Sequence, residues 1–324
     1  MDGHHIECHD FATASEFLHA LLPTSNVWSS QKLERHIFRG HADATWPLIP
    51  TAMRSLETNN YRQRAKEIEA LSSFWLEADR QGLPVPGDCD KVRRLWIGPA
   101  ARGVVGRETL ALAGRGDWAE ELGIWPPPDI WQGLALAQHY GIPTRLLDWS
   151  RLGIVAAYFA AQEAAEKLGA PGAPSRMAVW ACHENILLMT PWLEPSDQRV
   201  HLVVVPRSGN PNLHAQHGVF TLVISAGMGH ELPDQDVVAC LRFDEVIGLV
   251  YQACKAADSN MFVTLTAAAG PPLRKLTLPC SEAPMLLEFL DALGVSGATM
   301  KPGFGGAADG AKERALRKRL KDGK

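Results

Sequence analysis

The sequence predicts an α+β fold, in which a helix-rich N-terminal half packs on a mainly antiparallel sheet from the C-terminal half. Two observations carry this prediction. Before residue 170 most segments show the spacing of apolar side chains that is typical of helices, whereas later segments are rich in β-branched residues or alternate in polarity. Because helices and strands are segregated along the chain, we expect no series of alternating βαβ units.

The expected helices follow start and stop signals. Thr13 and Glu16 have capping-box spacing ahead of a short amphipathic segment that Pro23 ends. Asp129 and Ser281 are expected to cap the helices that follow them. The longer helices are expected over residues 62–81, 129–140, 153–168 and 285–293.

The expected strands are short runs with alternating or β-branched residues. The first covers residues 35–40 and ends in a turn, and the glycine-rich segment 303–306 is interpreted as a loop. The remaining strands are expected over residues 177–182, 200–205, 219–225, 246–251, 261–265 and 273–278.

A single domain is expected over residues 1–310. Within it, residues 82–128 are rich in Gly, Pro and Trp and are interpreted as a loop-rich insertion or cover. Residues 311–324 hold seven Lys or Arg and two acidic residues, which predicts a basic helical tail that is either solvated or in contact with nucleic acid or a partner.

Composition narrows the class of protein. A formal charge of -4 gives no general drive toward nucleic acid, and 46% hydrophobic residues are enough for a sizeable core. The six cysteines form no CxxC pair and no zinc-ligand cluster, so no metal is expected. The N-terminus lacks the apolar core of a leader, and no apolar run reaches the ~20 residues of a membrane helix. We therefore expect a cytoplasmic protein with free thiols and no membrane contact.

The first candidate for chemistry is Phe38-Arg39-Gly40, at the end of the expected strand. Phe38 would anchor the strand, and Gly40 would permit a turn with positive φ or the close approach of a ligand. An arginine fixed in this way suits a carboxylate or phosphate. The alternative for Arg39 is a buried salt bridge, for example to Asp148.

The second candidate is the polar segment 138–150, of which residues 141–150 are expected to join two helices. Thr144 and Ser150 supply hydroxyls, and Trp149 supplies a stacking face. Arg145 and Asp148 form an ion pair or contact a ligand, and Asp148 alternatively holds Arg39 or Arg145 in place. His139 is either an acid–base group or a hydrogen-bonded structural histidine at a helix end.

These segments resemble the FRG domain family. Phe38-Arg39-Gly40, followed by Trp46, Leu48, Pro50 and Arg54, resembles its opening signature. Gln138-His-Tyr-Gly-Ile-Pro-Thr-Arg-Leu-Leu-Asp-Trp-Ser150, with Ala156-Ala-Tyr-Phe-Ala160, resembles its central motif, and Ala215-Gln-His-Gly-Val-Phe-Thr221 its third block. The resemblance covers roughly residues 30–310 and implies a bacterial stress or phage defence setting.

The order of elements is also similar to that of mono-ADP-ribosyltransferases of the Arg–Ser–Glu type, which implies an ADP-ribosyltransferase-like fold. By this resemblance Arg39 would bind the phosphate or ribose of NAD, Trp149 and Ser150 would line the nicotinamide pocket, and Tyr158 could stack. Gln216 occupies the third position, where such a transferase carries Glu, and Glu245 is an alternative source of a carboxylate.

The resemblances leave two hypotheses. The first is an enzyme with Arg39, Ser150 and Gln216 as catalytic residues and NAD as substrate, either an ADP-ribosyltransferase or an NAD glycohydrolase. Its target would be a protein or nucleic acid. The second is a module that binds nucleic acid or a partner protein without chemistry. Both place ligand contacts at Phe38, Gly40, His139, Thr144, Arg145, Asp148, Trp149 and Tyr158, and predict that Arg39, Trp149, Ser150 and Gln216 line one cleft.

Overall fold

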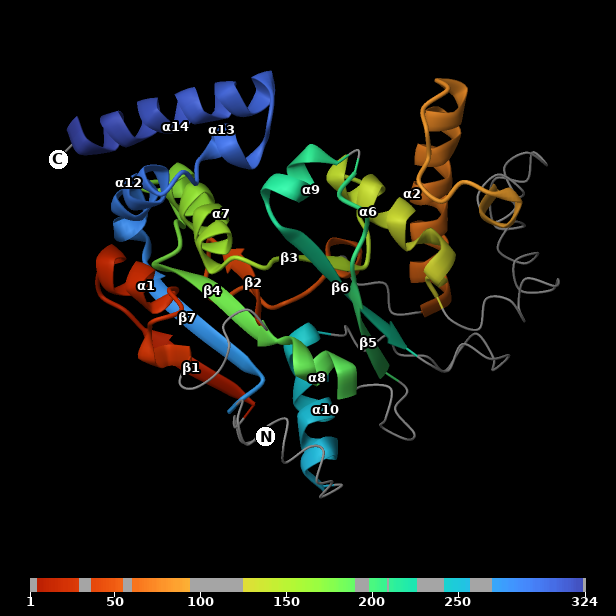
Figure 1. Cartoon of the computed structure of the whole chain (residues 1–324), viewed down its shortest axis with the longest axis horizontal. Coiled ribbons are helices and arrows are strands. Elements are labelled where there is room, and N and C mark those ends of the chain that lie inside the picture. Colours follow the sequence, from red (N-terminus) through yellow and green to blue (C-terminus); the bar gives the residue numbers. More distant parts are fainter. Residues whose placement is uncertain are drawn as a thin grey trace.

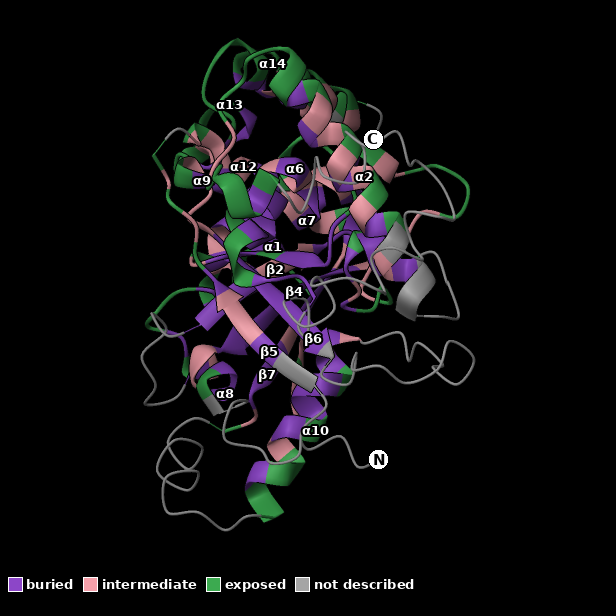
Figure 2. Ribbon diagram, turned by 90° about the vertical axis from the view of Figure 1, so that its right-hand side faces the viewer, coloured by how far each residue is buried: buried purple, intermediate pink, exposed green. Residues whose placement is uncertain are grey.

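The computed structural model describes residues 5–28, 36–54, 60–93, 125–189, 198–208, 210–225, 242–256 and 270–322. Within these residues a seven-stranded, mostly antiparallel sheet lies at the centre of the protein, with helices packed around it (Figure 1). Its strands, in spatial order, are β1 (Ile6–Asp10), β7 (Leu273–Pro279), β4 (Arg176–His183), β2 (His36–His41), β3 (Leu146–Ser150), β6 (Gly218–Ser225) and β5 (Gln198–Val203). Figure 2 shows that most of the sheet is buried.

The sheet is divided in its middle. Strands β2 and β4 pair at six positions and β3 and β6 at five, but β2 and β3 pair only at Phe38 and Ser150. The strands β1, β7, β4 and β2 therefore form one part of the sheet and β3, β6 and β5 the other. Because the one shared pair lies at the last residue of β3, the two strands diverge along the rest of β3, and this divergence positions the candidate site.

Three groups of helices cover the sheet. Helices α1 (Ala14–Ala20), α7 (Gly153–Lys167) and α12 (Ala283–Ala292) build a core on one face of β2, β4 and β7. Helices α8 (Glu184–Met189) and α10 (Phe243–Ala256) build a second core on the opposite face. Helices α2 (Asn60–Arg80) and α6 (Trp131–His139) pack with β3, β5 and β6 in a third.

Shorter elements connect these groups. Helix α9 (Pro211–Ala215) precedes β6, and α13 (Gly297–Met300) leads to the last helix, α14 (Phe304–Asp322), which lies across α12 and α7 in Figure 1. Four 3-10 helices complete the described elements: η1 (Asn26–Trp28), η3 (Thr51–Met53), η4 (Pro128–Ile130) and η6 (Cys280–Glu282). No helix in the described part of the chain has both the length and the apolar character needed to cross a membrane.

Gly40 sets the distance between β2 and α7. A Cβ atom built on Gly40 would lie 2.0 Å from the backbone oxygen of Ala156 and 2.9 Å from the backbone nitrogen of Ala160. Gly40 does not have a positive φ. The close approach at Gly40 is therefore made by a helix backbone where a ligand was expected, and the alanines of α7 permit it because they add little bulk.

The predicted elements are largely confirmed. Expected helices agree with α1, α2, α6, α7 and α12, and Thr13 forms the capping box with Glu16. Expected strands agree with β2, β4, β5, β6 and β7. The mixed class and the mostly antiparallel sheet are therefore as predicted. The expected strand 261–265 and residues 94–124 of the expected insertion lie outside the described residues.

Four local predictions are wrong. Residues 246–251 belong to helix α10, because Val246, Ile247, Val250 and Cys254 follow helical spacing and are buried together. Asp129 and Ser281 do not cap α6 and α12, since each lies in the 3-10 turn before its helix. Of the expected loop 303–306, Gly305 and Gly306 lie in the first turn of α14, whereas Gly303 lies in the turn before it with a φ of 112°. Residues 141–150 are only partly a connector, because their second half is the central strand β3.

The segregation of helices and strands is not observed either. Strands β1, β2 and β3 come from the first 150 residues, and α12 to α14 follow the last described strand. Strand β1 pairs in parallel with β7, so strands that are far apart in the sequence are neighbours in the sheet. The expected boundary between residues 310 and 311 falls inside α14, where Glu313 is buried and Leu316 and Leu320 pack on the first core.

Candidate functional site

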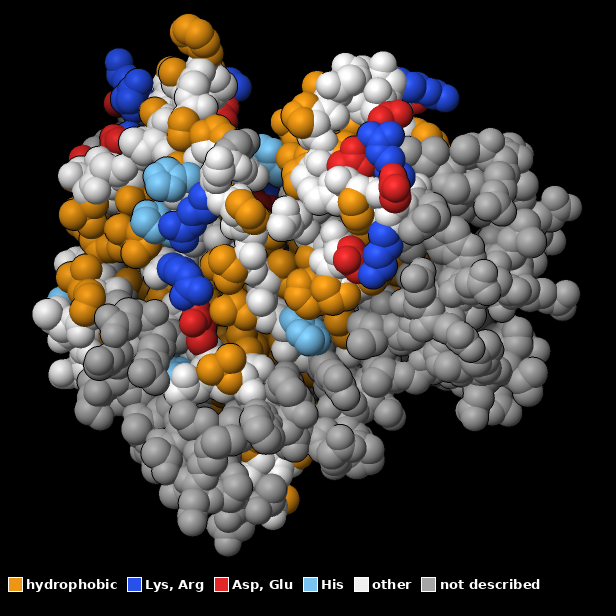
Figure 3. All heavy atoms as spheres, turned by 45° about the vertical axis from the view of Figure 1, so that its right-hand side comes forward, with side chains coloured by type: hydrophobic (Ala, Val, Ile, Leu, Met, Phe, Trp, Pro, Cys, Tyr) orange, Lys and Arg blue, Asp and Glu red, His pale blue; other side chains and the backbone are white. Residues whose placement is uncertain are grey.

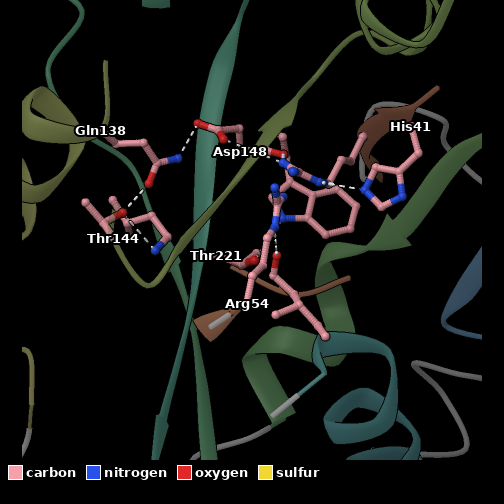
Figure 4. Close-up of polar contacts among 10 residues, drawn as sticks. His41, Arg54, Gln138, Thr144, Asp148 and Thr221 are labelled. Atoms are coloured by element: carbon pink, nitrogen blue, oxygen red, sulfur yellow. Dashed lines mark hydrogen bonds and ion pairs between the residues drawn. The ribbon is translucent and has the colours of Figure 1, made fainter. Parts of the chain in front are cut away.

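The candidate site lies where β2 and β3 diverge, and Arg39 is its centre. Arg39 Nη1 donates to the backbone oxygen of Asp148 at 2.7 Å and lies 3.6 Å from its carboxylate Oδ2 (Figure 4). The Arg39 side chain is 15% exposed, whereas that of Asp148 is 60% exposed. The predicted contact between these residues is present, but its shortest hydrogen bond goes to the main chain of Asp148.

His41 holds the other edge of the guanidinium. Arg39 Nε donates to His41 Nε2 at 3.1 Å, and His41 itself is only 5% exposed. Burial and the adjacent positive charge of Arg39 lower the pKa of His41 to about 3, so the imidazole is neutral and accepts the hydrogen bond. Sequence reasoning missed His41. The available signal was strand periodicity, since Arg39 and His41 are two residues apart and share one face of β2.

Asp148 is held in turn by the segment before β3. Gln138 Nε2 donates to Asp148 Oδ1 at 2.6 Å, and the hydroxyl of Thr144 donates to Gln138 Oε1. Thr144 Oγ1 also accepts from the backbone nitrogen of Leu146 at 3.2 Å. The polar residues of the central motif thus form a chain of hydrogen bonds that ends at Arg39.

Arg145 belongs to a different cluster. Its Nε donates to Glu67 Oε2 of α2 at 2.6 Å, and both side chains are less than a tenth exposed. Glu67 also accepts from Trp125 Nε1 at 3.0 Å and from Gln63 Nε2 at 2.8 Å. The structure pairs Arg145 with Glu67 and not with Asp148, and the partner on α2 was not identified from the sequence.

Ser150 and Gln216 form a second polar cluster next to the Phe38–Ser150 pair. Ser150 Oγ donates to the backbone oxygen of Gln216 at 2.8 Å and accepts from the backbone nitrogen of Leu152 at 3.0 Å. Gln216 Nε2 donates to the backbone oxygen of Met300 at 3.1 Å. These contacts join β3, the end of α9 and α13, and they occupy the Ser150 hydroxyl and the Gln216 amide nitrogen.

Three other predicted ligand contacts are buried. Trp149 donates to Thr221 Oγ1 at 2.8 Å and packs against Phe243 in the second core. Phe38 packs edge-on against Trp28 in the first core. Tyr158 donates its hydroxyl to Glu313 of α14, and burial, with that hydrogen bond, raises the pKa of Tyr158.

Two further predicted ligand contacts, His139 and Gly40, have other neighbours in the structure. His139 is exposed at the end of α6, where its Nε2 lies 3.1 Å from the amide nitrogen of Asn212. Gly40 is covered by α7. Glu245 of α10, the alternative carboxylate, pairs at 3.3 Å with Arg242, the residue before that helix. That Arg39, Trp149, Ser150 and Gln216 line one cleft stays a prediction.

Electrostatics at the site centre on Arg39. Burial lowers its pKa, the negative charge of Asp148 opposes that shift, and the positive charge of Arg54 adds to it. Within the described residues Arg39 Nη2 has no hydrogen-bond acceptor, so one edge of the guanidinium is available to a ligand. Figure 3 shows one face of the molecule hollowed between two raised parts, with charged and histidine side chains in the hollow. Among the described residues, no group of three or more His, Cys, Asp or Glu side chains is arranged to hold a metal ion.

Comparison with known proteins supports the family predicted from the central motif. The model of the FRG domain matches residues 118–168, which include Gln138, Asp148, Ser150 and all of α7. The chain therefore contains an FRG domain. No curated protein and no solved structure matches the chain.

Proposed function

We propose that this FRG domain binds a phosphate-bearing small molecule, with NAD as the first candidate, where β2 and β3 diverge. The observation that carries the proposal is the fixed guanidinium of Arg39. Asp148 and His41 hold Nη1 and Nε, while Nη2 has no acceptor within the described residues. A guanidinium fixed before the ligand arrives suits phosphate oxygens and loses little conformational entropy on binding.

An ADP-ribosyltransferase-like architecture is part of this proposal. It is supported by the order of Arg39, Ser150 and Gln216 along the chain and by the division of the sheet into two parts joined at one residue pair. In transferases of the Arg–Ser–Glu type the first-strand arginine holds NAD, which is the role proposed for Arg39. A bacterial stress or defence setting belongs to the proposal through the family resemblance alone.

Chemistry on NAD would depend on Asp148. Cleavage of the glycosidic bond passes through an oxocarbenium-like transition state that a nearby carboxylate stabilises. Gln216 has no carboxylate, and its amide nitrogen donates to Met300. Of the described carboxylates, Asp148 contacts Arg39 directly, and it already accepts from Gln138. These contacts favour a second candidate function, which is binding of the ligand, or of nucleic acid or a partner protein, without chemistry.

Calorimetric titration with NAD, ADP-ribose and ADP tests the proposal. The variants are Arg39→Ala, Arg39→Lys and, as a control of equal charge change, Arg80→Ala, whose side chain is 70% exposed on α2. We expect Arg39→Ala to weaken NAD binding at least tenfold, because a charge-assisted hydrogen bond contributes about 1.5–3 kcal/mol. Equal binding by wild type and Arg39→Ala, or no binding of any of the three ligands, would contradict the proposal.

A second measurement separates the two candidate functions. Release of nicotinamide from labelled NAD is followed for wild type, Arg39→Ala and Asp148→Asn. Release by wild type that both variants lose would identify an enzyme that uses Asp148, whereas binding without release would identify a binding module. A salt-dependent shift with short RNA or DNA, unaffected by Arg39→Ala, would instead favour nucleic-acid binding elsewhere on the chain.

A further inference from the structure

We infer that Arg54 is a second cation of this site, and that the site selects ligands with a diphosphate over ligands with a single phosphate. The inference rests on the proposed function, because it assigns a class of ligand to the region where β2 and β3 diverge. Arg54 is part of the opening motif, but its role there does not follow from the sequence.

The position of Arg54 follows from the turn after β2. Arg54 ends the short helix η3, and its Nε donates to the backbone oxygen of Ile49 at 3.3 Å. In Figure 4 the Arg54 side chain points toward the space between Asp148 and His41. The guanidinium of Arg39 occupies that space, because it contacts both residues. Two guanidinium groups therefore converge from β2 and from η3.

Positive charge at this point is incompletely balanced. Within the described residues Arg54 has no carboxylate partner, and its Nη1 and Nη2 have no hydrogen-bond acceptor, as is also the case for Nη2 of Arg39. Asp148 is the carboxylate that contacts Arg39, and Gln138 uses one of its oxygens. Burial lowers the pKa of Arg39, and the repulsion between Arg39 and Arg54 adds to that shift, so an anion bound between them would relieve an unfavourable interaction.

The number of guanidinium groups indicates the class of ligand. Each guanidinium presents a planar fork that matches two oxygens of one phosphate group. A diphosphate supplies two linked phosphate groups and can engage Arg39 and Arg54 together, whereas a monophosphate bound at Arg39 leaves Arg54 in water. A nucleotide diphosphate and inorganic pyrophosphate both carry two linked phosphate groups, so both fit this arrangement.

The test compares matched pairs of ligands, which are ADP with AMP and inorganic pyrophosphate with inorganic phosphate. Affinities are measured by calorimetry for wild type, Arg54→Gln and the control Arg80→Gln. We expect wild type and Arg80→Gln to bind ADP at least tenfold more tightly than AMP. In Arg54→Gln we expect the ADP affinity to fall about tenfold and the AMP affinity to change less than twofold. Binding of pyrophosphate that Arg54→Gln weakens would support the assignment. Binding of ADP that Arg54→Gln weakens, with no binding of pyrophosphate, would also support it and would identify a nucleotide as the ligand.

Salt dependence gives a second readout. The Arg54 side chain is exposed and the Arg39 side chain is 15% exposed, so salt should screen the contribution of Arg54 more strongly. We expect the difference between wild type and Arg54→Gln in ADP affinity to shrink in high salt, while the effect of Arg39→Ala persists.

The outcomes separate this inference from the proposed function. If NAD binding requires Arg39 but the ratio of ADP to AMP affinity is the same in wild type and Arg54→Gln, the inference fails and the proposed function stands. If wild type binds neither NAD, ADP nor pyrophosphate, both fail. A thermal unfolding curve of Arg54→Gln that matches wild type excludes misfolding as the cause of any lost affinity.

Discussion

The guanidinium of Arg39 donates to the main-chain oxygen of Asp148 at 2.7 Å and bridges two central strands that pair at only one position. The arginine thus fastens the two parts of the sheet together and remains available on its outer edge. Because the shortest contact is to the main chain, the position of Arg39 depends on the path of β3 more than on the carboxylate of Asp148.

Asp148→Asn is therefore expected to leave the fold intact. The carboxylate is 60% exposed and 3.6 Å from Arg39, so its loss should change the free energy of unfolding by less than about 1 kcal/mol. Affinity for NAD should rise a few-fold, because a negative charge beside the ligand phosphates is removed. Urea denaturation and calorimetry measure the two effects, and a large loss of NAD affinity would show that the carboxylate contacts the ligand favourably.

Replacement of His41 should change the pH dependence of stability. Burial and Arg39 lower its pKa from 6.5 to about 3, so between these values the unfolded chain binds more protons than the folded one. Stability should therefore fall as the pH falls through this window, by up to about 1.4 kcal/mol per pH unit. His41→Gln keeps an acceptor for Arg39 Nε but does not titrate. Between pH 7.5 and pH 5 its free energy of unfolding should fall by about 2 kcal/mol less than that of wild type, and equal losses would refute the assignment.

Gly40→Ala is expected to destabilise the protein by several kcal/mol, because its Cβ would lie 2.0 Å from the backbone oxygen of Ala156 and would push α7 from β2. Gly305→Ala is the control: it is also a glycine-to-alanine change, but no atom lies within 4 Å of its added Cβ. We expect this control to be neutral or stabilising by up to about 1 kcal/mol, since alanine favours helix. Similar midpoints of thermal unfolding for both variants would contradict the packing role of Gly40.

Tyr158→Phe should destabilise the protein without affecting ligand binding. The hydroxyl donates to buried Glu313, which also accepts from the backbone nitrogen of Gly297 at 3.1 Å. Loss of one donor to a buried carboxylate should cost about 1–3 kcal/mol. NAD affinity should be unchanged, because Tyr158 lies in the core between α7 and α14. Reduced affinity at full stability would instead support the stacking role that the transferase resemblance implies.

Glu67→Gln tests whether Arg145 is structural. The variant leaves the buried guanidinium of Arg145 without its counter-charge, and we expect a loss of about 3–5 kcal/mol in the free energy of unfolding. Glu77→Gln removes an exposed partner of Arg80 on the same helix and should cost less than about 0.5 kcal/mol. A small effect of Glu67→Gln would mean that the pair does not stabilise the fold.

Sequence reasoning found the segments of the site and the contact of Arg39 with Asp148, but not the contacts made by His41 and Glu67. Arg39, Asp148 and Gln138 lie in motifs that were identified, and the strand that carries Arg39 was predicted. His41 and Glu67 were missed because their importance depends on neighbours in space that no local pattern indicates. Trp149 was expected to face a ligand, yet strand β3 turns its indole toward Phe243.

The fold errors have a similar origin. The polar motif 141–150 contains few of the residues that mark a strand, so the pairing of β3 with β6 could not be inferred from it. Residues 246–251 form a short apolar run, and a run of this kind is compatible with a helix as well as with a strand. Strand β1 was not among the expected strands. It is short and largely polar, and its place in the sheet depends on pairing with β7.

That pairing has a consequence for how the protein acquires its structure during synthesis. Ile6 pairs with Leu273, which follows it more than 260 residues later in the chain. Strand β1 must therefore wait without its partner until β7 has left the ribosome. Such long-range pairing slows folding, so refolding from denaturant should be slow, and a nascent chain that ends before β7 should be unusually sensitive to protease at β1.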